Sequence, residues 1–141
     1  MNNTQVNEEV LSLISDQIDD INEETEYYTK LLEKLIDSED KSILRDIILS
    51  KKKHLCILKD MVYRLKGSRP IDTEPKQTEA PASNFPSEFK KAALKELSNS
   101  EIYRSLVFDF LNQSIRDSFT EIMTDCQNNS LKLSVLLTKY S

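Results

Sequence analysis

Apolar residues recur at a spacing of three and four positions in four stretches of the chain. In the first stretch, for example, they lie at Leu11, Ile14, Ile18 and Ile21. This spacing places side chains on one face of an α-helix. The predicted helices cover about 6–36, 41–66, 88–111 and 115–140. The whole chain, residues 1–141, is predicted to form one all-α domain in which the four apolar stripes share a core.

The ends of these helices carry residues that favour capping. The polar break at 37–40 supplies a candidate N-cap for the second helix. Gly67, the only glycine, directly follows that helix, where a left-handed residue would end it. Ser87 is the predicted N-cap of the third helix.

The segment from about 68 to 86 contains all four prolines and has no helical period, which is typical of a loop. At up to about 3.3 Å per residue, its 19 residues can cross the length of a neighbouring helix. The breaks between the first and second helices and between the third and fourth helices are short. Each of these pairs is therefore predicted to be antiparallel. We therefore expect a four-helix bundle made of two antiparallel hairpins joined by one long crossover loop.

The two predicted hairpins resemble each other when one is shifted by 75 residues along the chain. The shift aligns residues 26–32 with residues 101–107, and Ile47 with Ile122. The same offset of 75 residues aligns both helices of one hairpin with both helices of the other. Chance similarity between apolar stripes would not ensure a single offset for both. The pattern indicates a duplicated hairpin, and coincidence between amphipathic helices is the alternative.

The amino-acid composition argues against several classes of fold and function. Apolar residues make up 38% and charged residues 30%, and a single Gly without any Trp favours long helices over a β fold. A net charge of -5 argues against general binding to nucleic acid or anionic membranes. No early segment joins basic residues to an apolar run, and no run approaches the roughly 18 apolar residues of a membrane span. We therefore expect a cytoplasmic protein whose two cysteines, Cys56 and Cys126, are reduced and lie in the core.

Several positions on the predicted core stripes are polar, although burying an unpaired polar group is costly. These positions are Lys51, His54, Glu96, Ser100, Cys126 and Asn129. The 75-residue shift maps Lys51 to Cys126 and His54 to Asn129. We therefore predict a polar layer across the middle of the bundle.

The segments around these positions resemble the ferritin-like superfamily, and within it the rubrerythrin type of four-helix bundle. Residues 23–28 and 96–103 are similar to the family's Glu-rich stretch that ends in Tyr, and residues 48–54 and 122–129 are similar to its Asp-Glu-x-x-His segments. In the family, a Glu from the first helix of each hairpin and a Glu-x-x-His pair from the second hold two iron ions. The resemblance implies the ferritin-like arrangement, with its single long crossover.

The resemblance also implies six ligand positions, which are largely substituted in this chain. They are Ile21, Lys51 and His54 in the first hairpin and Glu96, Cys126 and Asn129 in the second. Only His54 and Glu96 keep the family's residue type, and both bridging carboxylates are missing. We therefore expect a degenerate di-iron site with neither a catalytic residue nor a metal.

The favoured hypothesis is a non-catalytic bundle without a cofactor, which has a structural or protein-interaction role. Lys51 is expected to form an ion pair with Glu96 that replaces the charge of the metal. His54 and Asn129 are expected to be hydrogen-bonded nearby. The partner would be a protein of unknown identity, and a homodimer is compatible with this hypothesis.

Three alternatives stay open. His54, Glu96 and Cys126 could instead hold one zinc or iron ion. Cys126 beside Lys51 could have a lowered pKa and act as a redox thiol. The acidic face of the first helix, which includes Glu24, is expected to be solvated, although it could instead meet a basic partner.

Overall fold

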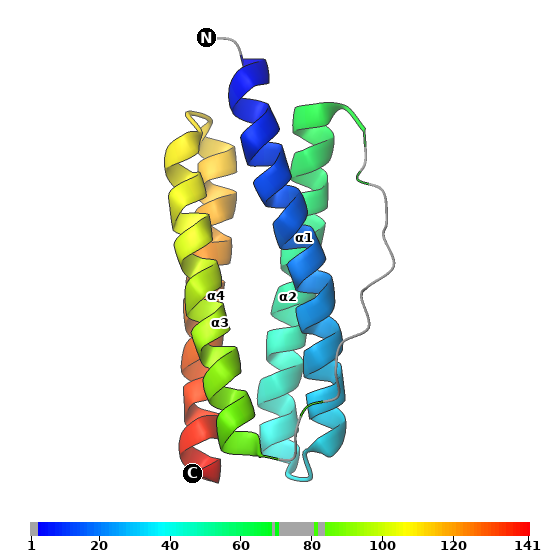
Figure 1. Ribbon diagram of the computed structural model, residues 1–141, viewed down its shortest axis with the longest axis vertical. Coiled ribbons are helices and arrows are strands. Elements are labelled where there is room, and N and C mark those ends of the chain that lie inside the picture. The colour runs from blue at the N-terminus through cyan, green and yellow to red at the C-terminus, as the bar shows by residue number, and fades with distance from the viewer. Residues whose placement is uncertain (1–2, 69, 71–80, 82–83) are drawn as a thin grey trace.

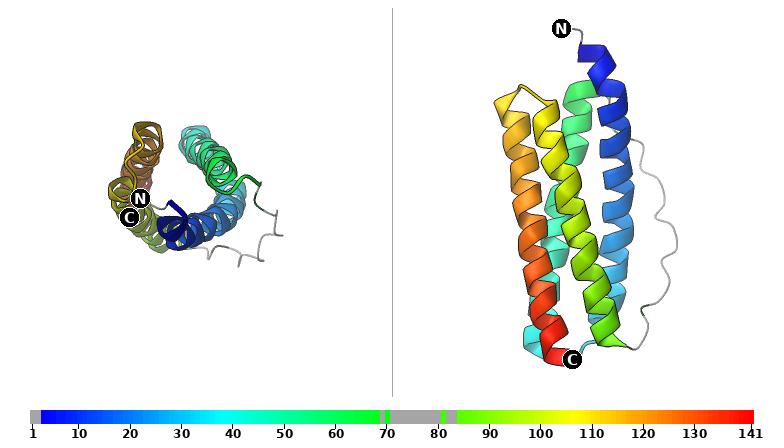
Figure 2. Two further views of the ribbon diagram at one scale, coloured as in Figure 1. Left: turned by 90° about the horizontal axis from the view of Figure 1, so that it is seen from above. Right: turned by 60° about the vertical axis from the view of Figure 1, so that its left-hand side comes forward.

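The computed structural model describes residues 3–68, 70, 81 and 84–141 of the chain. Its helices are α1 (Asn3–Lys34), α2 (Ser38–Lys66), α3 (Phe85–Asp109) and α4 (Gln113–Tyr140). Within these ranges there is no strand, and no helix is both long and apolar enough to cross a membrane. The four helices stand side by side along one axis (Figure 1, Figure 2). The prediction of an all-α four-helix bundle is therefore confirmed.

Each hairpin is antiparallel, and a crossover joins the two hairpins. In Figure 1, α1 descends and α2 returns to the upper end of the bundle, whereas α3 begins again at the lower end. Consequently α2 and α3 run in the same direction, and α4 runs back. Between the hairpins, α2 packs against α4 and α1 against α3. Most of the predicted crossover at 68–86 lies outside the described residues, but α2 ends and α3 begins at opposite ends of the bundle.

The helix boundaries differ from the predicted ones by a few residues, because capping groups decide where a helix begins and ends. Gly67 ends α2 with a left-handed φ of 79°, as predicted. Ser87 is not the N-cap of α3, since Asn84 has this role and accepts a hydrogen bond from the Ser87 N–H. The helices begin at 3, 38, 85 and 113 rather than 6, 41, 88 and 115, and the first and third end at 34 and 109 rather than 36 and 111.

The fold repeats with the predicted offset of 75 residues. The ends of α1 and α3, at 34 and 109, and the starts of α2 and α4, at 38 and 113, both obey it. The N-caps are also equivalent, because Asp37 and Asn112 each accept a hydrogen bond from the backbone N–H three residues further on. The two hairpins thus share their inner helix ends and caps at one offset, which supports a duplication.

Two apolar clusters fill the bundle on either side of its middle. The upper cluster includes Ile14, Ile21, Leu58 and Phe119, and the lower cluster includes Leu31, Leu44 and Leu133. The predicted polar positions are buried, as expected: they are Lys51, His54, Glu96, Ser100, Cys126 and Asn129. The sequence therefore identifies these six, whereas Gln17, Asp40, Glu88, Asn99 and Ser130 are also buried and were not predicted.

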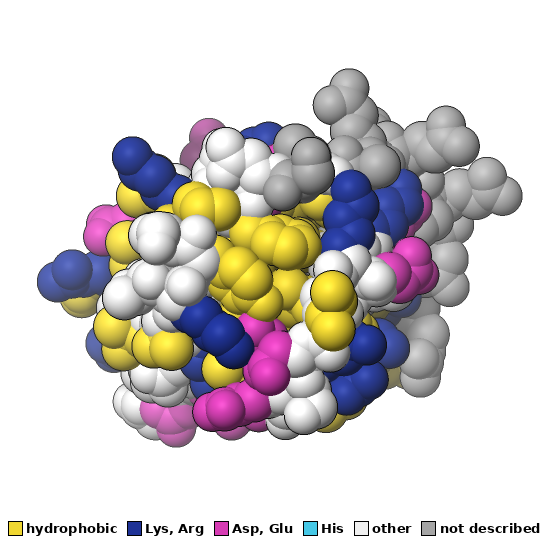
Figure 3. All heavy atoms as spheres, turned by 90° about the horizontal axis from the view of Figure 1, so that it is seen from below, with side chains coloured by type: hydrophobic (Ala, Val, Ile, Leu, Met, Phe, Trp, Pro, Cys, Tyr) yellow, Lys and Arg dark blue, Asp and Glu magenta, His cyan; other side chains and the backbone are white. Residues whose placement is uncertain are grey.

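Aromatic rings close the lower cluster. Phe85 and Phe89 of α3 pack against Tyr140 of α4, with ring centroids 5.1 and 5.6 Å apart. Figure 3 views this end of the bundle from below, where hydrophobic side chains gather at the centre and charged side chains lie among the groups around them. The C-terminal end of α4 is thereby anchored to the start of α3.

Candidate functional site

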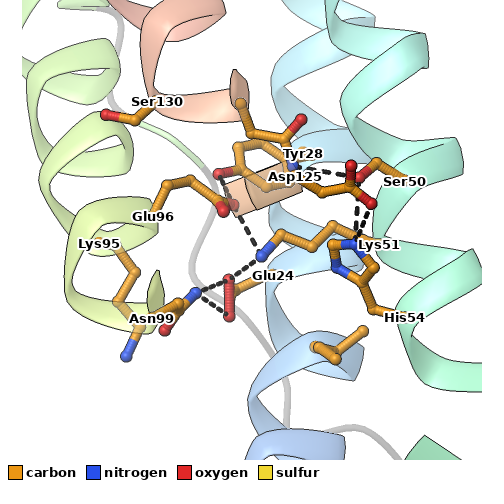
Figure 4. A network of polar contacts seen from close by, with 12 residues as sticks. Glu24, Tyr28, Ser50, Lys51, His54, Lys95, Glu96, Asn99, Asp125 and Ser130 are labelled. Atoms are coloured by element: carbon orange, nitrogen blue, oxygen red, sulfur yellow. Dashed lines mark hydrogen bonds and ion pairs between the residues drawn. The ribbon is translucent and has the colours of Figure 1, made fainter. Parts of the chain in front are cut away.

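The polar layer is centred on Lys51, which enters the bundle from α2 and is only 1% exposed. Its Nζ lies 2.8 Å from Glu96 Oε1 on α3 and 3.1 Å from Glu24 Oε2 on α1. Figure 4 shows the ammonium reaching between these two carboxylates. The predicted pair between Lys51 and Glu96 is therefore formed, and a third helix contributes to it. One cation connects three of the four helices at mid-bundle.

Glu24 is the site residue that the sequence pattern misses. The pattern assigns it to a solvated face, but its side chain is 11% exposed and both of its oxygens are bonded. Asn99 donates from Nδ2 to Glu24 Oε1 at 3.1 Å and to Oε2 at 2.9 Å. Glu24 follows Ile21 by three residues and precedes Tyr28 by four, which is core-stripe spacing. That spacing is the signal that could have identified it.

The contact between Glu24 and Asn99 joins equivalent residues of the two hairpins, because the 75-residue shift maps one residue onto the other. In the same way, the shift maps the buried Tyr28 onto the buried Tyr103. Tyr28 belongs to the lower apolar cluster and Tyr103 to the upper one, so these equivalent residues lie on either side of the polar layer. The charged residues differ between the two hairpins, because Lys51 corresponds to Cys126 and Glu96 corresponds to Ile21.

Burial and the neighbouring charges have opposite effects on the pKa of Lys51. Burial alone lowers the pKa of a lysine, but the charges of Glu24 and Glu96 outweigh it and raise the pKa of Lys51 above 10.5. Burial raises the pKa of Glu24, and Lys51 offsets this rise only in part. The Tyr28 hydroxyl donates to Glu96 Oε1 at 2.9 Å, and burial beside that carboxylate raises the pKa of Tyr28. At neutral pH the layer therefore holds a permanently charged ammonium.

A second group of polar contacts connects α2 with α4. His54 Nε2 lies 2.9 Å from Asp125 Oδ2, and Asn129 donates from Nδ2 to Ser50 Oγ at 3.3 Å. The 75-residue shift exchanges these contacts, because it maps His54 to Asn129 and Ser50 to Asp125. His54 and Asn129 therefore bond across the interface between the hairpins. The prediction that both residues are hydrogen-bonded is confirmed, and each bonds to a partner on the other hairpin.

His54 is expected to titrate below its ordinary pKa of 6.5, because burial lowers the pKa and the hydrogen bond to Asp125 offsets only part of the effect. An NMR titration of the imidazole checks this, and His54 is the only histidine in the chain. Asp125→Asn should lower the midpoint further, since it removes the stabilising carboxylate. A midpoint above 6.5 in the wild type would contradict the described environment.

The lowered pKa of His54 also makes the stability of the protein depend on pH. Because the folded pKa of His54 lies below the unfolded value of about 6.5, the neutral ring contributes stability above that pH. This contribution is lost as the pH falls below about 6.5 toward the folded pKa. His54→Asn, which introduces the residue of the equivalent position 129, should therefore reduce the loss of unfolding free energy between about pH 7 and pH 5.

The three residues of the alternative metal site are not brought together as a ligand set. Among the residues that the structure describes, no three His, Cys, Asp or Glu side chains are grouped so that they could hold a metal ion. His54 is bonded to Asp125, whereas Glu96 accepts from Lys51 and Tyr28. The ammonium of Lys51 also lies 2.8 Å from Glu96 Oε1, where it repels any cation that approaches this carboxylate.

The thiols differ from the expectations in two respects. Cys56 and Cys126 are both free, but Cys56 is exposed rather than part of the core. Burial raises the pKa of Cys126, and the nearby Lys51 offsets only part of that rise. The alternative of a lowered pKa at Cys126 is therefore wrong, and the thiol stays protonated.

The charged groups of the layer connect different helices. Lys51 is held by two carboxylates, both oxygens of Glu24 are bonded, and Cys126 is an uncharged thiol. The contacts of Lys51 and Glu24 thus link α1, α2 and α3. In comparison with known proteins, the chain matches no protein-family model, no curated protein and no solved structure.

Proposed function

We propose that the protein is a non-catalytic, ferritin-like bundle in which a buried ammonium takes the place of a metal centre, and that its role is to bind another protein. The observation that carries this proposal is the position of Lys51 Nζ, 3.1 Å from Glu24 and 2.8 Å from Glu96. The carboxylates come from the first helix of each hairpin and the lysine from a second helix. Ferritin-like carboxylate proteins use these same helices to hold cations at mid-bundle.

The residue types at the centre support substitution of the metal by a side chain. Lys51 stands where the resemblance places a bridging Glu, and Glu96 keeps the family's residue. Glu24, one turn after Ile21, supplies the carboxylate of the first hairpin. A buried ion pair adds little net stability, because desolvation offsets most of the attraction. Its contribution is to specify which helices face each other.

Metal analysis tests the proposal directly. Protein purified without an affinity tag is expected to contain far less than one transition-metal ion per chain by plasma mass spectrometry. Addition of Mn²⁺, Fe²⁺ or Zn²⁺ is expected to leave its Tm unchanged, because a ligand that does not bind the native state does not stabilise it. A stoichiometric metal that is lost on Glu96→Ala would overturn the proposal.

Lys51→Glu provides the reciprocal experiment. It replaces the ammonium by a third buried carboxylate beside Glu24 and Glu96, so the variant should be strongly destabilised without metal. Divalent metal should then raise its Tm, because a cation again compensates the carboxylates. Lys52→Glu is the matched control, since Lys52 is the exposed neighbour on the same helix. An equal response of both variants to metal would count against the central site.

A further inference from the structure

We propose that the bundle binds a small organic anion with a planar apolar body, such as an aromatic carboxylate, in a cavity between α1 and α3. The cavity has a volume of about 400 Å³ and borders the central polar layer, because Glu24 and Tyr28 belong to both. This volume is within the range of about 300–1,000 Å³ that is typical of small-molecule sites. The cavity is a second site of the fold, and binding there does not depend on the proposed replacement of a metal.

Two tyrosine rings and an alanine supply apolar surface to the cavity. Tyr27 and Tyr28 of α1 are in edge-to-face contact, with ring centroids 5.6 Å apart, and Ala92 of α3 also lines the cavity. The Tyr27 hydroxyl donates a hydrogen bond to Glu88. The Tyr28 hydroxyl donates to Glu96, so both rings are held in place. Rings that are fixed before binding lose little conformational entropy when a flat apolar ligand packs against them.

The 75-residue repeat provides an internal reference for this cavity. At the position equivalent to Ala92, the first hairpin has Gln17, whose longer side chain is buried with only 3% exposed. The smaller alanine leaves room between the helices that a glutamine takes up at the equivalent place. In addition, α1 and α3 have the least extensive contact of the four pairs of packed helices. The cavity therefore depends on the residue at position 92 and is not required by the fold.

The α3 wall of the cavity is cationic. Lys91 and Lys95 line it and are four residues apart, so they project from the same side of α3. The first hairpin has acidic residues at both equivalent positions, Asp16 and Asp20. The charge is therefore reversed at the place where the cavity lies. Lys95 Nζ lies 3.6 Å from Asp20 Oδ2, but both side chains are partly exposed, and such a pair is weak enough for an anionic ligand to replace.

Two glutamates also line the cavity, but their charges do not cancel the preference for an anion. Glu24 pairs with Lys51 at 3.1 Å and accepts from Asn99 through both oxygens, so its charge is compensated inside the bundle. Among the described residues that line the cavity, Glu23 is then the acidic side chain that remains against two lysines. This balance favours a carboxylate beside the lysines, with the apolar body of the ligand against the tyrosine rings.

Binding of β-naphthoate to the full-length protein tests the proposal. This probe is a bicyclic aromatic carboxylate, and isothermal titration calorimetry is expected to give one site per chain with a Kd below about 1 mM. β-Naphthylmethanol has the same rings without the charge and should bind at least about 5-fold more weakly. β-Naphthylmethylamine, which is a cation, should bind more weakly still. Tighter binding of the amine than of the carboxylate would overturn the proposal.

Three variants locate the site. Ala92→Gln introduces the residue of the equivalent position 17 and fills the cavity, so it should raise the Kd of β-naphthoate by about 10-fold or more. Lys91→Gln combined with Lys95→Gln should weaken β-naphthoate to a similar extent but leave the binding of β-naphthylmethanol unchanged. Lys90→Gln is the matched control, because Lys90 is exposed on the same helix but does not line the cavity, and it should leave the binding of both probes unchanged.

Far-UV circular dichroism should be unchanged in all of these variants, which shows that a loss of binding does not come from unfolding. No binding of β-naphthoate to the wild type overturns the proposed site, as does binding that survives Ala92→Gln. An equal loss with Lys90→Gln and with the double lysine variant would mean general attraction to a basic surface and would also overturn it. The metal content of the protein is measured separately, so none of these results changes the test of the central polar layer.

Discussion

Replacing Lys51 by methionine is expected to lower the free energy of unfolding by about 3–5 kcal/mol. The substitution keeps an unbranched side chain of similar length but removes the ammonium, which leaves Glu24 and Glu96 as buried carboxylates without a cation. An uncompensated buried charge costs far more than the intact pair contributes. Urea denaturation followed by circular dichroism measures the loss. It should shrink as the pH falls, because burial already raises the pKa of Glu24 above 4.5.

Two further variants test whether the loss comes from charge. Lys52→Met, on the exposed neighbour of Lys51, should change stability by no more than about 0.5 kcal/mol. Adding Glu24→Gln and Glu96→Gln to Lys51→Met should recover much of the loss, since no charge is then left buried. A loss below about 1 kcal/mol for Lys51→Met alone would contradict the described layer.

Phe119→Ala is expected to cost about 3–5 kcal/mol, and Leu44→Ala, at the equivalent position of the first hairpin, about 2–5 kcal/mol. Both side chains are fully buried, Phe119 in the upper cluster and Leu44 in the lower. Because Lys51 connects both hairpins, we expect each variant to unfold in one transition with the wild-type dependence on urea. Circular dichroism and tyrosine fluorescence should report the same midpoint.

Leu111→Ala is the control for the core variants, since Leu111 is 84% exposed and its truncation should cost less than about 0.5 kcal/mol. Separate transitions for the two probes, or two steps in one of them, would mean that the hairpins unfold independently. That outcome would contradict the role assigned to the central ion pair.

The sequence by itself determined the four helices, their pairing into hairpins and the presence of a polar layer. The helices and the polar layer depend on residues that are neighbours along one helix, so a spacing of three and four positions is sufficient to predict them. The hairpins follow from the short breaks between the paired helices. Lys51, His54 and Glu96 are recognisable because each interrupts an apolar stripe. Gly67 is likewise predictable, because only its own backbone conformation ends α2.

Only the tertiary structure decided which partner each buried polar side chain meets. Glu24 is one of nine acidic residues on α1, yet it is the one that forms an ion pair with Lys51, and the partner of His54 is Asp125 on α4. These contacts join different helices, and a shift of one helix by a single turn of about 5.4 Å would exchange the partners. Local periodicity therefore predicts that a polar residue is buried. The packing of the hairpins determines whether that residue forms an ion pair, forms a hydrogen bond or binds a ligand.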